Sequence, residues 1–278
     1  MSADENGRPD GLRSSARLSG RSFTPVKAVV LAGGMGTRLR PYTSVLPKPL
    51  MPLGDRSILE LLLRQLSRRG FVDITLSVGH LAHLIEAVLG NGGGHEVDIK
   101  YVREDAPLGT AGPLRLIERP DDTFLMLNGD LITTLDYREL VRHHRAEDNV
   151  MTIATRHREL RTEYGVIRAA RSDTGSQRVV GYDEKPVFDF MVSMGIYVLE
   201  PSALDFIPDA GYFDLPDLVR SLLAANATVG AFEYDGLWLD IGRHEDYEQA
   251  QILWEEGKLT ELFEEDPPTA APLVAIGG

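Results

Sequence analysis

The sequence predicts an α/β fold with a Rossmann-like, mostly parallel (mixed) sheet flanked by helices. From Val26 onward, strand-like apolar segments alternate with segments whose apolar residues recur at helical spacing. This β-α-β alternation is typical of parallel strands joined by crossover helices that cover both faces of a sheet. The chain has 278 residues, 43% of them apolar, which is enough for one large α/β domain or two small ones.

The expected elements follow one another along the chain. Strands are expected at 26–32, 73–78, 97–102, 123–127 and 150–155, and helices at 58–69, 81–89, 112–117 and 135–145. Ser57 is a candidate N-cap for the helix 58–69, and Gly70 follows its end. After about Arg156 short strands dominate, at 165–169, 178–183 and 192–199, which indicates a second lobe beside the sheet. Helices at 201–207, 215–225 and 245–255 and a strand at 228–233 complete the fold.

The two ends of the chain differ from this pattern. Residues 1–25 carry arginines among serine and glycine and lack an apolar central run, so we expect a disordered leader and no secretory signal. Residues 26–255 form the predicted functional domain, and 256–278 a loose C-terminal tail. No internal repeat is visible, and in particular no periodic repeat that would indicate a C-terminal β-helix.

The composition excludes several classes of function. The chain has no cysteine, which excludes disulfides and thiolate metal sites. The net charge of −13 argues against nucleic-acid binding, so a basic site must be local. No apolar stretch is long enough to cross a bilayer. We therefore expect a cytoplasmic protein with no nucleic-acid and no membrane partner.

A glycine-rich loop follows the first expected strand and predicts a polyphosphate site. Leu31-Ala32-Gly33-Gly34-Met35-Gly36-Thr37-Arg38-Leu39 is followed by Pro47-Lys48-Pro49. Glycines let backbone N–H groups approach phosphate oxygens, and Arg38 and Lys48 supply the positive charge. The loop lacks the Gly-Lys-Ser/Thr of a P-loop, and the prolines that follow are unlike the helix of a dinucleotide fingerprint.

Two aspartates indicate a magnesium site. Asp130 ends the segment Asn128-Gly129-Asp130 after an apolar strand, and Asp240 lies in the second apolar segment Trp238-Leu239-Asp240-Ile241-Gly242. Strand ends of an α/β sheet point into the ligand crevice, and paired carboxylates beside phosphates suit Mg²⁺. Either aspartate taken alone could equally be a turn residue.

These motifs together resemble those of the sugar-1-phosphate nucleotidyltransferases (sugar-nucleotide pyrophosphorylases), over Val26 to about Ala250. The resemblance implies condensation of a nucleoside triphosphate with a sugar 1-phosphate and release of pyrophosphate. It implies that Arg38 stabilises the leaving pyrophosphate, that Lys48 contacts the reacting phosphates, and that Asp130 and Asp240 bind Mg²⁺. The nucleotide-binding residues that it implies are Leu31, Ala32, Gly33, Gly34, Gly36, Thr37, Glu104, Gly109 and Thr110.

The segment Glu104–Gly112 resembles the base-recognition loop of the mannose and heptose 1-phosphate guanylyltransferases. Guanine presents two adjacent donors, which a carboxylate such as Glu104 can accept, whereas thymine presents one N–H between two carbonyls. GTP is therefore favoured, with dTTP, CTP or UTP as alternatives. A solvated loop acid remains an equal interpretation of Glu104.

The resemblance also implies a small sugar-binding lobe at about 156–200. Tyr164-Gly165-Val166 and Glu184-Lys185-Pro186 match the sugar-pocket motifs, with Lys185 on the sugar phosphate and Glu184 on sugar hydroxyls. Ser193 replaces the asparagine of many glucose-specific relatives, which leaves mannose, a heptose or a cyclitol phosphate as candidates. By analogy a homo-oligomer is expected, with a dimer favoured.

Two other classes of protein remain as alternatives. A glycosyltransferase would need an Asp-x-Asp metal motif at a strand end, and Asn128-Gly129-Asp130 differs from it. A non-catalytic nucleotide-sugar sensor would be favoured by loss of Arg38, Lys48 or either aspartate, and the sequence retains them all. An active enzyme is therefore the favoured hypothesis.

Overall fold

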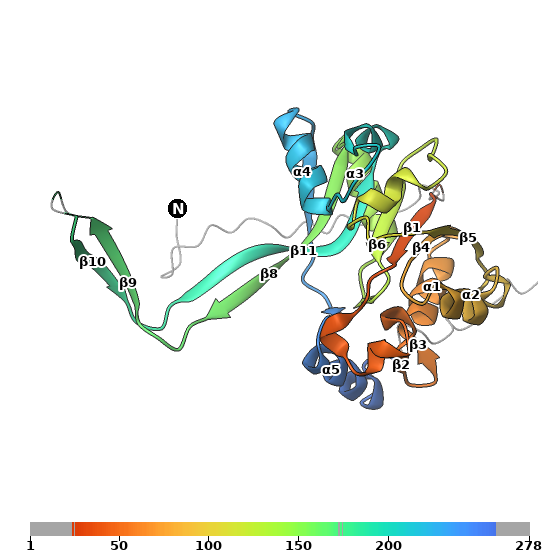
Figure 1. The fold of residues 1–278 in the computed structure, drawn as a ribbon, viewed down its shortest axis with the longest axis horizontal. Coiled ribbons are helices and arrows are strands. Elements are labelled where there is room, and N and C mark those ends of the chain that lie inside the picture. The colour runs from red at the N-terminus through yellow and green to blue at the C-terminus, as the bar shows by residue number, and fades with distance from the viewer. Residues whose placement is uncertain (1–23, 25, 172, 174, 260–278) are drawn as a thin grey trace, which may run out of the picture.

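A seven-stranded sheet forms the centre of the molecule (Figure 1). The computed structural model describes residues 24, 26–171, 173 and 175–259. The strand order is β12-β8-β11-β6-β1-β4-β5, and in this sheet β11 alone runs antiparallel to the other six strands. The strands span Val229–Glu233 (β12), Met151–Arg161 (β8), Val187–Leu199 (β11), Phe124–Asn128 (β6), Ala28–Ala32 (β1), Asp73–Val78 (β4) and Asp98–Arg103 (β5). The mixed, mostly parallel sheet confirms the predicted fold class.

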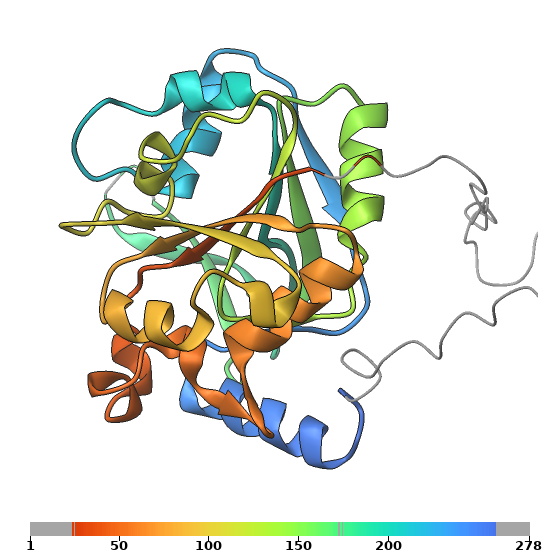
Figure 2. The same ribbon diagram turned by 90° about the vertical axis from the view of Figure 1, so that its right-hand side faces the viewer.

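Helices cover both faces of the sheet (Figure 2). On one face α1 (Ile58–Arg68), α2 (Ala82–Leu89) and α3 (Tyr137–Ala146) enclose the larger apolar core with strands β1, β4, β6 and β11. On the other face α4 (Leu215–Ala224) and two 3₁₀ turns, Gly112–Arg115 and Pro201–Phe206, enclose a second core. Both 3₁₀ turns replace helices that the sequence analysis predicted. No helix in the described part of the chain is long and apolar enough to cross a bilayer.

A third apolar core lies beyond the carboxyl ends of the strands. Here α5 (His244–Glu255) packs on a small hairpin of β2 (Pro52–Leu53) and β3 (Arg56–Ser57). Beside them β7 (Leu131–Thr133) pairs antiparallel with β13 (Trp238–Asp240). This pairing brings together two segments that lie about a hundred residues apart in sequence.

The predicted N-cap of α1 is confirmed. The Ser57 hydroxyl accepts from the backbone N–H of Glu60, and the Glu60 carboxylate accepts from the backbone N–H of Ser57. This reciprocal capping box satisfies two donors that a helix start otherwise leaves unpaired.

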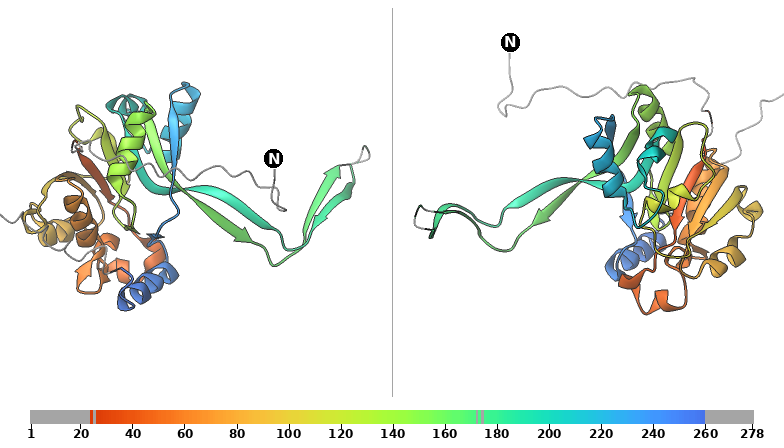
Figure 3. Two further views of the ribbon diagram at one scale, coloured as in Figure 1. Left: turned by 180° about the vertical axis from the view of Figure 1, so that it is seen from behind. Right: turned by 45° about the horizontal axis from the view of Figure 1, so that its top comes forward.

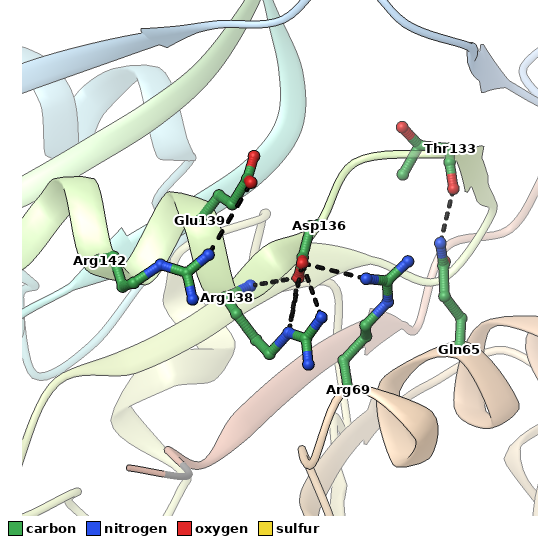
Figure 4. A network of polar contacts seen from close by, with 7 residues as sticks. All are labelled: Gln65, Arg69, Thr133, Asp136, Arg138, Glu139 and Arg142. Carbon is green, nitrogen blue, oxygen red and sulfur yellow. Dashed lines mark hydrogen bonds and ion pairs between the residues drawn. The ribbon is translucent and has the colours of Figure 1, made fainter. Parts of the chain in front are cut away.

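A polar network then ties α1 to the segment between β7 and α3 (Figure 4). Gln65 donates to the backbone oxygen of Thr133 at 2.6 Å, and Asp136 pairs with Arg69 at 3.0 Å and with Arg138 at 2.8 Å. The network fixes the entry to α3, whose N-cap is Asp136. It thereby ties the end of β7 to α1.

Strands β8 and β11 leave the sheet together as a long two-stranded ribbon (Figures 1 and 3). Beyond a bend, the ribbon continues as the hairpin β9 (Val166–Arg171) and β10 (Gln177–Asp183). We call residues 156–193 the arm. The sequence analysis predicted the two long strands only at 150–155 and 192–199. It missed their extensions because residues 157–161 and 187–191 are all exposed and so show no pattern of burial.

The predicted leader, residues 1–25, lies almost wholly outside the described residues. So does the predicted tail from residue 260 onward.

Candidate active site

An open pocket of about 650 Å³ lies at the carboxyl ends of the central strands. Strands β1, β5 and β6 end at its rim, where parallel strands of an open sheet direct their last residues into a crevice. Its lining includes Leu31, Ala32, Gly33, Gly34, Gly36, Thr37, Arg38, Lys48, Glu104, Gly109, Thr110 and Asp130. These are all of the residues that the sequence analysis assigned to the nucleotide and to catalysis, apart from the second metal candidate.

The glycine-rich loop leaves β1 and forms one wall of the pocket. A Cβ at Gly33 would lie 2.5 Å from Oε1 of Glu104, so only glycine allows this carboxylate to pack against the loop. The Thr43 hydroxyl donates to the carbonyl oxygen of Gly36 at 2.7 Å, which holds the loop in place. Arg38 follows in the 3₁₀ turn Thr37–Leu39, where its side chain is exposed on the pocket wall.

Lys48 lies between the two candidate metal ligands. Its ammonium pairs with Oδ2 of Asp130 and lies 4.0 Å from Oδ1 of Asp240. The backbone N–H of Ile241 donates to the carbonyl oxygen of Asp130 at 3.1 Å, so the two aspartates lie on adjacent segments. Burial and the neighbouring charge of Asp130 raise the pKa of the Asp240 carboxyl, although Lys48 opposes this shift.

The pair of aspartates fits a divalent cation. Oδ1 of Asp130 is buried, and within the described residues it has no hydrogen-bond partner. A buried carboxylate oxygen without a partner is costly, and a cation would satisfy it. No cluster of three or more His, Cys, Asp or Glu occurs in the described ranges, so such a cation would complete its shell with water and phosphate oxygens. Mg²⁺ is usually bound in this way.

The carboxylate of Glu104 lies beside the glycine-rich loop and is held there by two hydrogen bonds. The Ser77 hydroxyl donates to Oε1 of Glu104 at 3.0 Å, and the backbone N–H of Leu108 donates to Oε2 at 3.3 Å. These two bonds orient the carboxylate, and each oxygen keeps a second lone pair for a ligand. Glu104 is therefore a fixed acceptor on the pocket wall.

The loop that follows Glu104 is attached to the start of α4. Gly109 has φ +85°, and a Cβ there would lie 2.5 Å from the carbonyl oxygen of Phe213. Asp214 accepts from the backbone N–H of Thr110 at 2.9 Å and from its hydroxyl at 3.2 Å. Asp214 and Tyr212 also line the pocket, and the sequence analysis missed both. The order Asp214, Pro216, Asp217 signals a helix start, but nothing local in the sequence indicates contact with a loop a hundred residues earlier.

The residues assigned to the sugar phosphate lie apart from this pocket. Gly165, Glu184 and Lys185 are at the bend of the arm, and none of them lines the pocket. Glu184 accepts from the hydroxyl of Tyr182 at 2.7 Å, and Lys185 has a left-handed backbone with φ +44°.

Ser193 lies at the base of the arm, where it hydrogen-bonds the Tyr197 hydroxyl at 2.8 Å. Two residues further on, Gly195 precedes the point at which Ile196 pairs with Leu127. The next residue of β6 is Asn128, which lines the pocket. The base of the arm therefore borders the pocket, and its bend does not.

The model of the nucleotidyl transferase family matches residues 27–256, and the chain belongs to this family. A UTP–glucose-1-phosphate uridylyltransferase of Synechocystis sp. is 36% identical over 245 residues, which cover 81% of this chain and 62% of that protein. A mannose-1-phosphate guanyltransferase of Yarrowia lipolytica is 34% identical over 264 residues, covering 91% of this chain and 70% of the relative. The chain thus spans roughly two thirds of the length of these curated relatives.

Solved structures share the fold. HddC from Yersinia pseudotuberculosis matches with a TM-score of 0.62 and 24% identity over 82% of this chain and 99% of that chain. A UDP-glucose pyrophosphorylase complexed with UDP-glucose matches with a TM-score of 0.60 and 18% identity, over 84% and 99%. At this level of identity the likeness concerns the architecture alone.

Proposed function

We propose that the protein condenses a nucleoside triphosphate, GTP by preference, with a sugar or sugar-like cyclitol 1-phosphate, giving a nucleoside diphosphate sugar and pyrophosphate. The observation that carries this proposal is the convergence of the glycine loop, Arg38, Lys48 and Asp130 in one pocket. Family membership and the names of the relatives support the same reaction class.

The proposed reaction is an in-line displacement. An oxygen of the sugar 1-phosphate attacks the α-phosphorus of the triphosphate, a new P–O bond forms, and the bond to the β-phosphate oxygen breaks as pyrophosphate leaves. The attacking phosphate has a second pKa of about 6, so it is already ionised and needs no general base. Lys48 and Arg38 neutralise charge on the reacting and leaving phosphates, which is the main requirement of phosphoryl chemistry.

We further propose that Asp130 and Asp240 hold Mg²⁺. When bound, the ion would neutralise phosphate charge and orient the triphosphate. With the charge of the two aspartates balanced by such an ion, Lys48 would be able to contact phosphate in place of part of its pairing with Asp130. We assign the nucleotide to the end of β1 and the loop after it (Leu31, Ala32, Gly33, Gly34, Gly36 and Thr37) and to Glu104, Gly109 and Thr110. We assign the sugar phosphate to Gly165, Glu184, Lys185 and Ser193. This assignment requires the bend of the arm to lie against a pocket that holds the sugar phosphate.

Glu104 supports the preference for guanine. Its carboxylate is oriented by Ser77 and Leu108 and can accept both the ring N–H and the amino group of guanine. Glu104→Gln replaces one acceptor by a donor that faces the guanine donors. We expect the ratio of kcat/KM for GTP over UTP to fall by about tenfold or more, as for the loss of a charged hydrogen bond. An unchanged ratio would remove Glu104 from base recognition.

The decisive experiment is a screen of pyrophosphate release. GTP, dTTP, CTP and UTP are each combined with the 1-phosphates of mannose, glucose, a heptose and a cyclitol. We expect release to require both substrates and Mg²⁺ and to be fastest with GTP. Nucleotide binding without turnover on any combination would instead indicate a non-catalytic sensor.

A further inference from the structure

Tyr212 presents an exposed aromatic ring at the pocket. It lines the pocket at the carboxyl ends of the strands and is 65% exposed. Within the described part of the chain it belongs to none of the three apolar cores, so the ring is not held there by packing. Among the described residues that line the pocket, it is the single Phe, Tyr or Trp. An aromatic ring that its own chain leaves uncovered beside a pocket is available to a ligand.

The backbone that follows Tyr212 is fixed through Phe213. The Phe213 ring packs against the second core, and its backbone N–H donates to the carbonyl oxygen of Leu108 at 2.8 Å. The Phe213 carbonyl oxygen accepts from the backbone N–H groups of Ala111 at 3.1 Å and of Gly112 at 2.8 Å. Phe213 therefore joins Tyr212 to the loop that carries the proposed contacts with the base.

The backbone that precedes Tyr212 is fixed through Arg115. This arginine ends the 3₁₀ turn that comes directly after the same loop. Its guanidinium donates to the carbonyl oxygen of Gly211 at 2.6 Å and to that of Pro208 at 3.1 Å. Tyr212 is thus held from both sides by one neighbouring segment of the chain.

Asp214 orients the side chain of Tyr212. Both residues line the pocket, whereas Phe213 between them packs inward, as alternate residues of an extended segment do. A hydrogen bond to the Asp214 carboxylate raises the pKa of the Tyr212 hydroxyl. Asp214 also accepts from the backbone N–H of Thr110 at 2.9 Å, so it is itself fixed. With its hydroxyl engaged by Asp214, Tyr212 offers a ligand the face of its ring.

A nucleobase is the ligand group that suits such a ring. Glu104 is proposed to accept from the edge of the base, which leaves the two faces of the base uncovered. These faces are π surfaces that stack on aromatic side chains. Removing an aromatic ring that stacks on a base by alanine substitution lowers affinity by about 5- to 150-fold.

We propose that the ring of Tyr212 stacks on the base of the bound nucleoside triphosphate, and that Arg115 positions this ring. The inference rests on the proposed function, because it takes the pocket to be the nucleotide site. Glu104 and Tyr212 then divide the recognition of the base. Glu104 selects guanine through hydrogen bonds, whereas Tyr212 adds affinity for any base, since every base has a π face. Arg115 touches no ligand and acts through Tyr212.

The test is the affinity of the intact chain for GTP with Mg²⁺, measured by calorimetry. Tyr212→Ala should weaken binding by at least about fivefold. Tyr212→Phe keeps the ring and should bind within about twofold of the unaltered protein. Tyr182→Ala is the matched control and should bind GTP normally. Tyr182 is 60% exposed and also hydrogen-bonds a carboxylate two residues further on, that of Glu184, but it lies on the arm, away from the pocket.

A double-mutant cycle tests the role of Arg115. Arg115→Ala should weaken GTP binding by at least about threefold when Tyr212 is present, and should have no further effect in the Tyr212→Ala variant. Arg119→Ala is the matched control and should leave the affinity unchanged. Arg119 also holds a neighbouring segment, since it donates to Asp205 at 2.7 Å and to the carbonyl oxygen of Pro201 at 2.8 Å, but it does not hold Tyr212.

The outcomes separate this inference from the proposed function. If the unaltered protein binds GTP and Tyr212→Ala binds it equally well, or if Tyr212→Phe loses as much affinity as Tyr212→Ala, stacking is refuted and the proposed function stands. A lower melting temperature of Tyr212→Ala would show that the ring supports the fold, and would also refute stacking. An effect of Arg115→Ala that persists in full without the ring would refute its positioning role.

The choice of base does not limit the test. If UTP, CTP or dTTP binds more tightly than GTP, the same variants are compared with that nucleotide, because stacking does not depend on the identity of the base. An unaltered protein that binds none of the four would overturn both the proposed function and this inference.

Discussion

At the scale of single residues, Lys48 neutralises part of the negative charge in the pocket. It is fixed between Pro47 and Pro49 and lies between two carboxylates that would otherwise repel each other. One lysine cannot neutralise both, and the remaining repulsion together with burial raises the pKa of Asp240. Lys48 therefore leaves part of the negative charge of the two carboxylates unbalanced.

The raised pKa of Asp240 predicts a pH-dependent affinity for the metal. In the folded protein without metal, Asp240 keeps its proton to a higher pH than an ordinary aspartate, whose pKa is about 3.9. A cation requires the ionised form, so protons compete with it and its affinity falls as the pH is lowered toward the raised pKa. Acidification has the opposite effect on the stability of the metal-free protein. Because the folded state holds the proton on Asp240 more tightly than the unfolded chain does, the free energy of unfolding rises as the pH is lowered toward the raised pKa.

The measurement is Mn²⁺ binding by electron paramagnetic resonance between pH 7 and pH 5. We expect the affinity for Mn²⁺ to be lower at pH 5 than at pH 7 in the unaltered protein, because the raised pKa of Asp240 brings protonation closer to this range. Asp240→Asn should bind more weakly at pH 7 and lose most of the dependence on pH. A variant that keeps the full dependence would mean that another group controls the site.

Arg38 and Arg40 offer a matched pair for testing charge stabilisation. Both are exposed, but Arg38 lines the pocket and Arg40 does not. Arg38→Ala should lower kcat by about a hundredfold, as expected for loss of a group that stabilises developing charge. Its melting temperature should be unchanged, because the side chain buries little surface. Arg40→Ala should retain nearly normal turnover, and equal losses in the two variants would refute the specific role of Arg38.

The pocket residues that the sequence indicated were found because they lie in short contiguous motifs. Gly33, Arg38 and Glu104 each lie at or shortly after the end of a strand, so the strand assignment also places them. Asp214 could not be found in this way, because its role depends on tertiary contact with Thr110. The assignment of the sugar phosphate to Gly165, Glu184, Lys185 and Ser193 stays a prediction, since the first three lie at the bend of the arm, away from the pocket.

At the scale of elements, the start of α1 can be tested through its capping box. Ser57→Ala removes the acceptor of the Glu60 N–H and the partner of the Glu60 carboxylate. We expect a loss of about 1 kcal/mol in the free energy of unfolding, as for other serine N-caps. Ser44→Ala, at an exposed position, should change it by less than about 0.5 kcal/mol. Chemical denaturation measures both, and equal values would contradict the importance of the cap.

Helices and strands were predicted well where one of their faces is buried and poorly where both faces are exposed. The helix 58–69 was expected almost to the residue, because apolar periodicity and cap agree. The extensions of β8 and β11 carry charged and apolar residues that all face solvent, so burial left no pattern in the sequence. The short pair β7 and β13 was also missed as strands, because it joins segments distant in sequence.

At the scale of the whole molecule, the pocket at the carboxyl ends of the strands and the arm are separate parts. The three apolar cores lie in the sheet and its helices, and the pocket is lined by no described residue of the arm. The paired stretch from Val187 to Ser193 spans seven residues, or about 20 Å at the rise of a strand. In this conformation Lys185 is thus far from the pocket at the strand ends. The nucleoside triphosphate and the sugar 1-phosphate would therefore be bound by different parts of the structure.

This separation predicts the effect of removing the arm. His157 and Met191 are directly paired, so residues 158–190 can be replaced by Asn-Gly, which forms a two-residue hairpin turn. The shortened protein should fold, because the cores remain, and should bind GTP with unchanged affinity by calorimetry. Turnover should fall below detection, since Gly165, Glu184 and Lys185 are lost together. Retained turnover would show that the sugar phosphate binds elsewhere, and lost GTP binding would show that the arm supports the pocket after all.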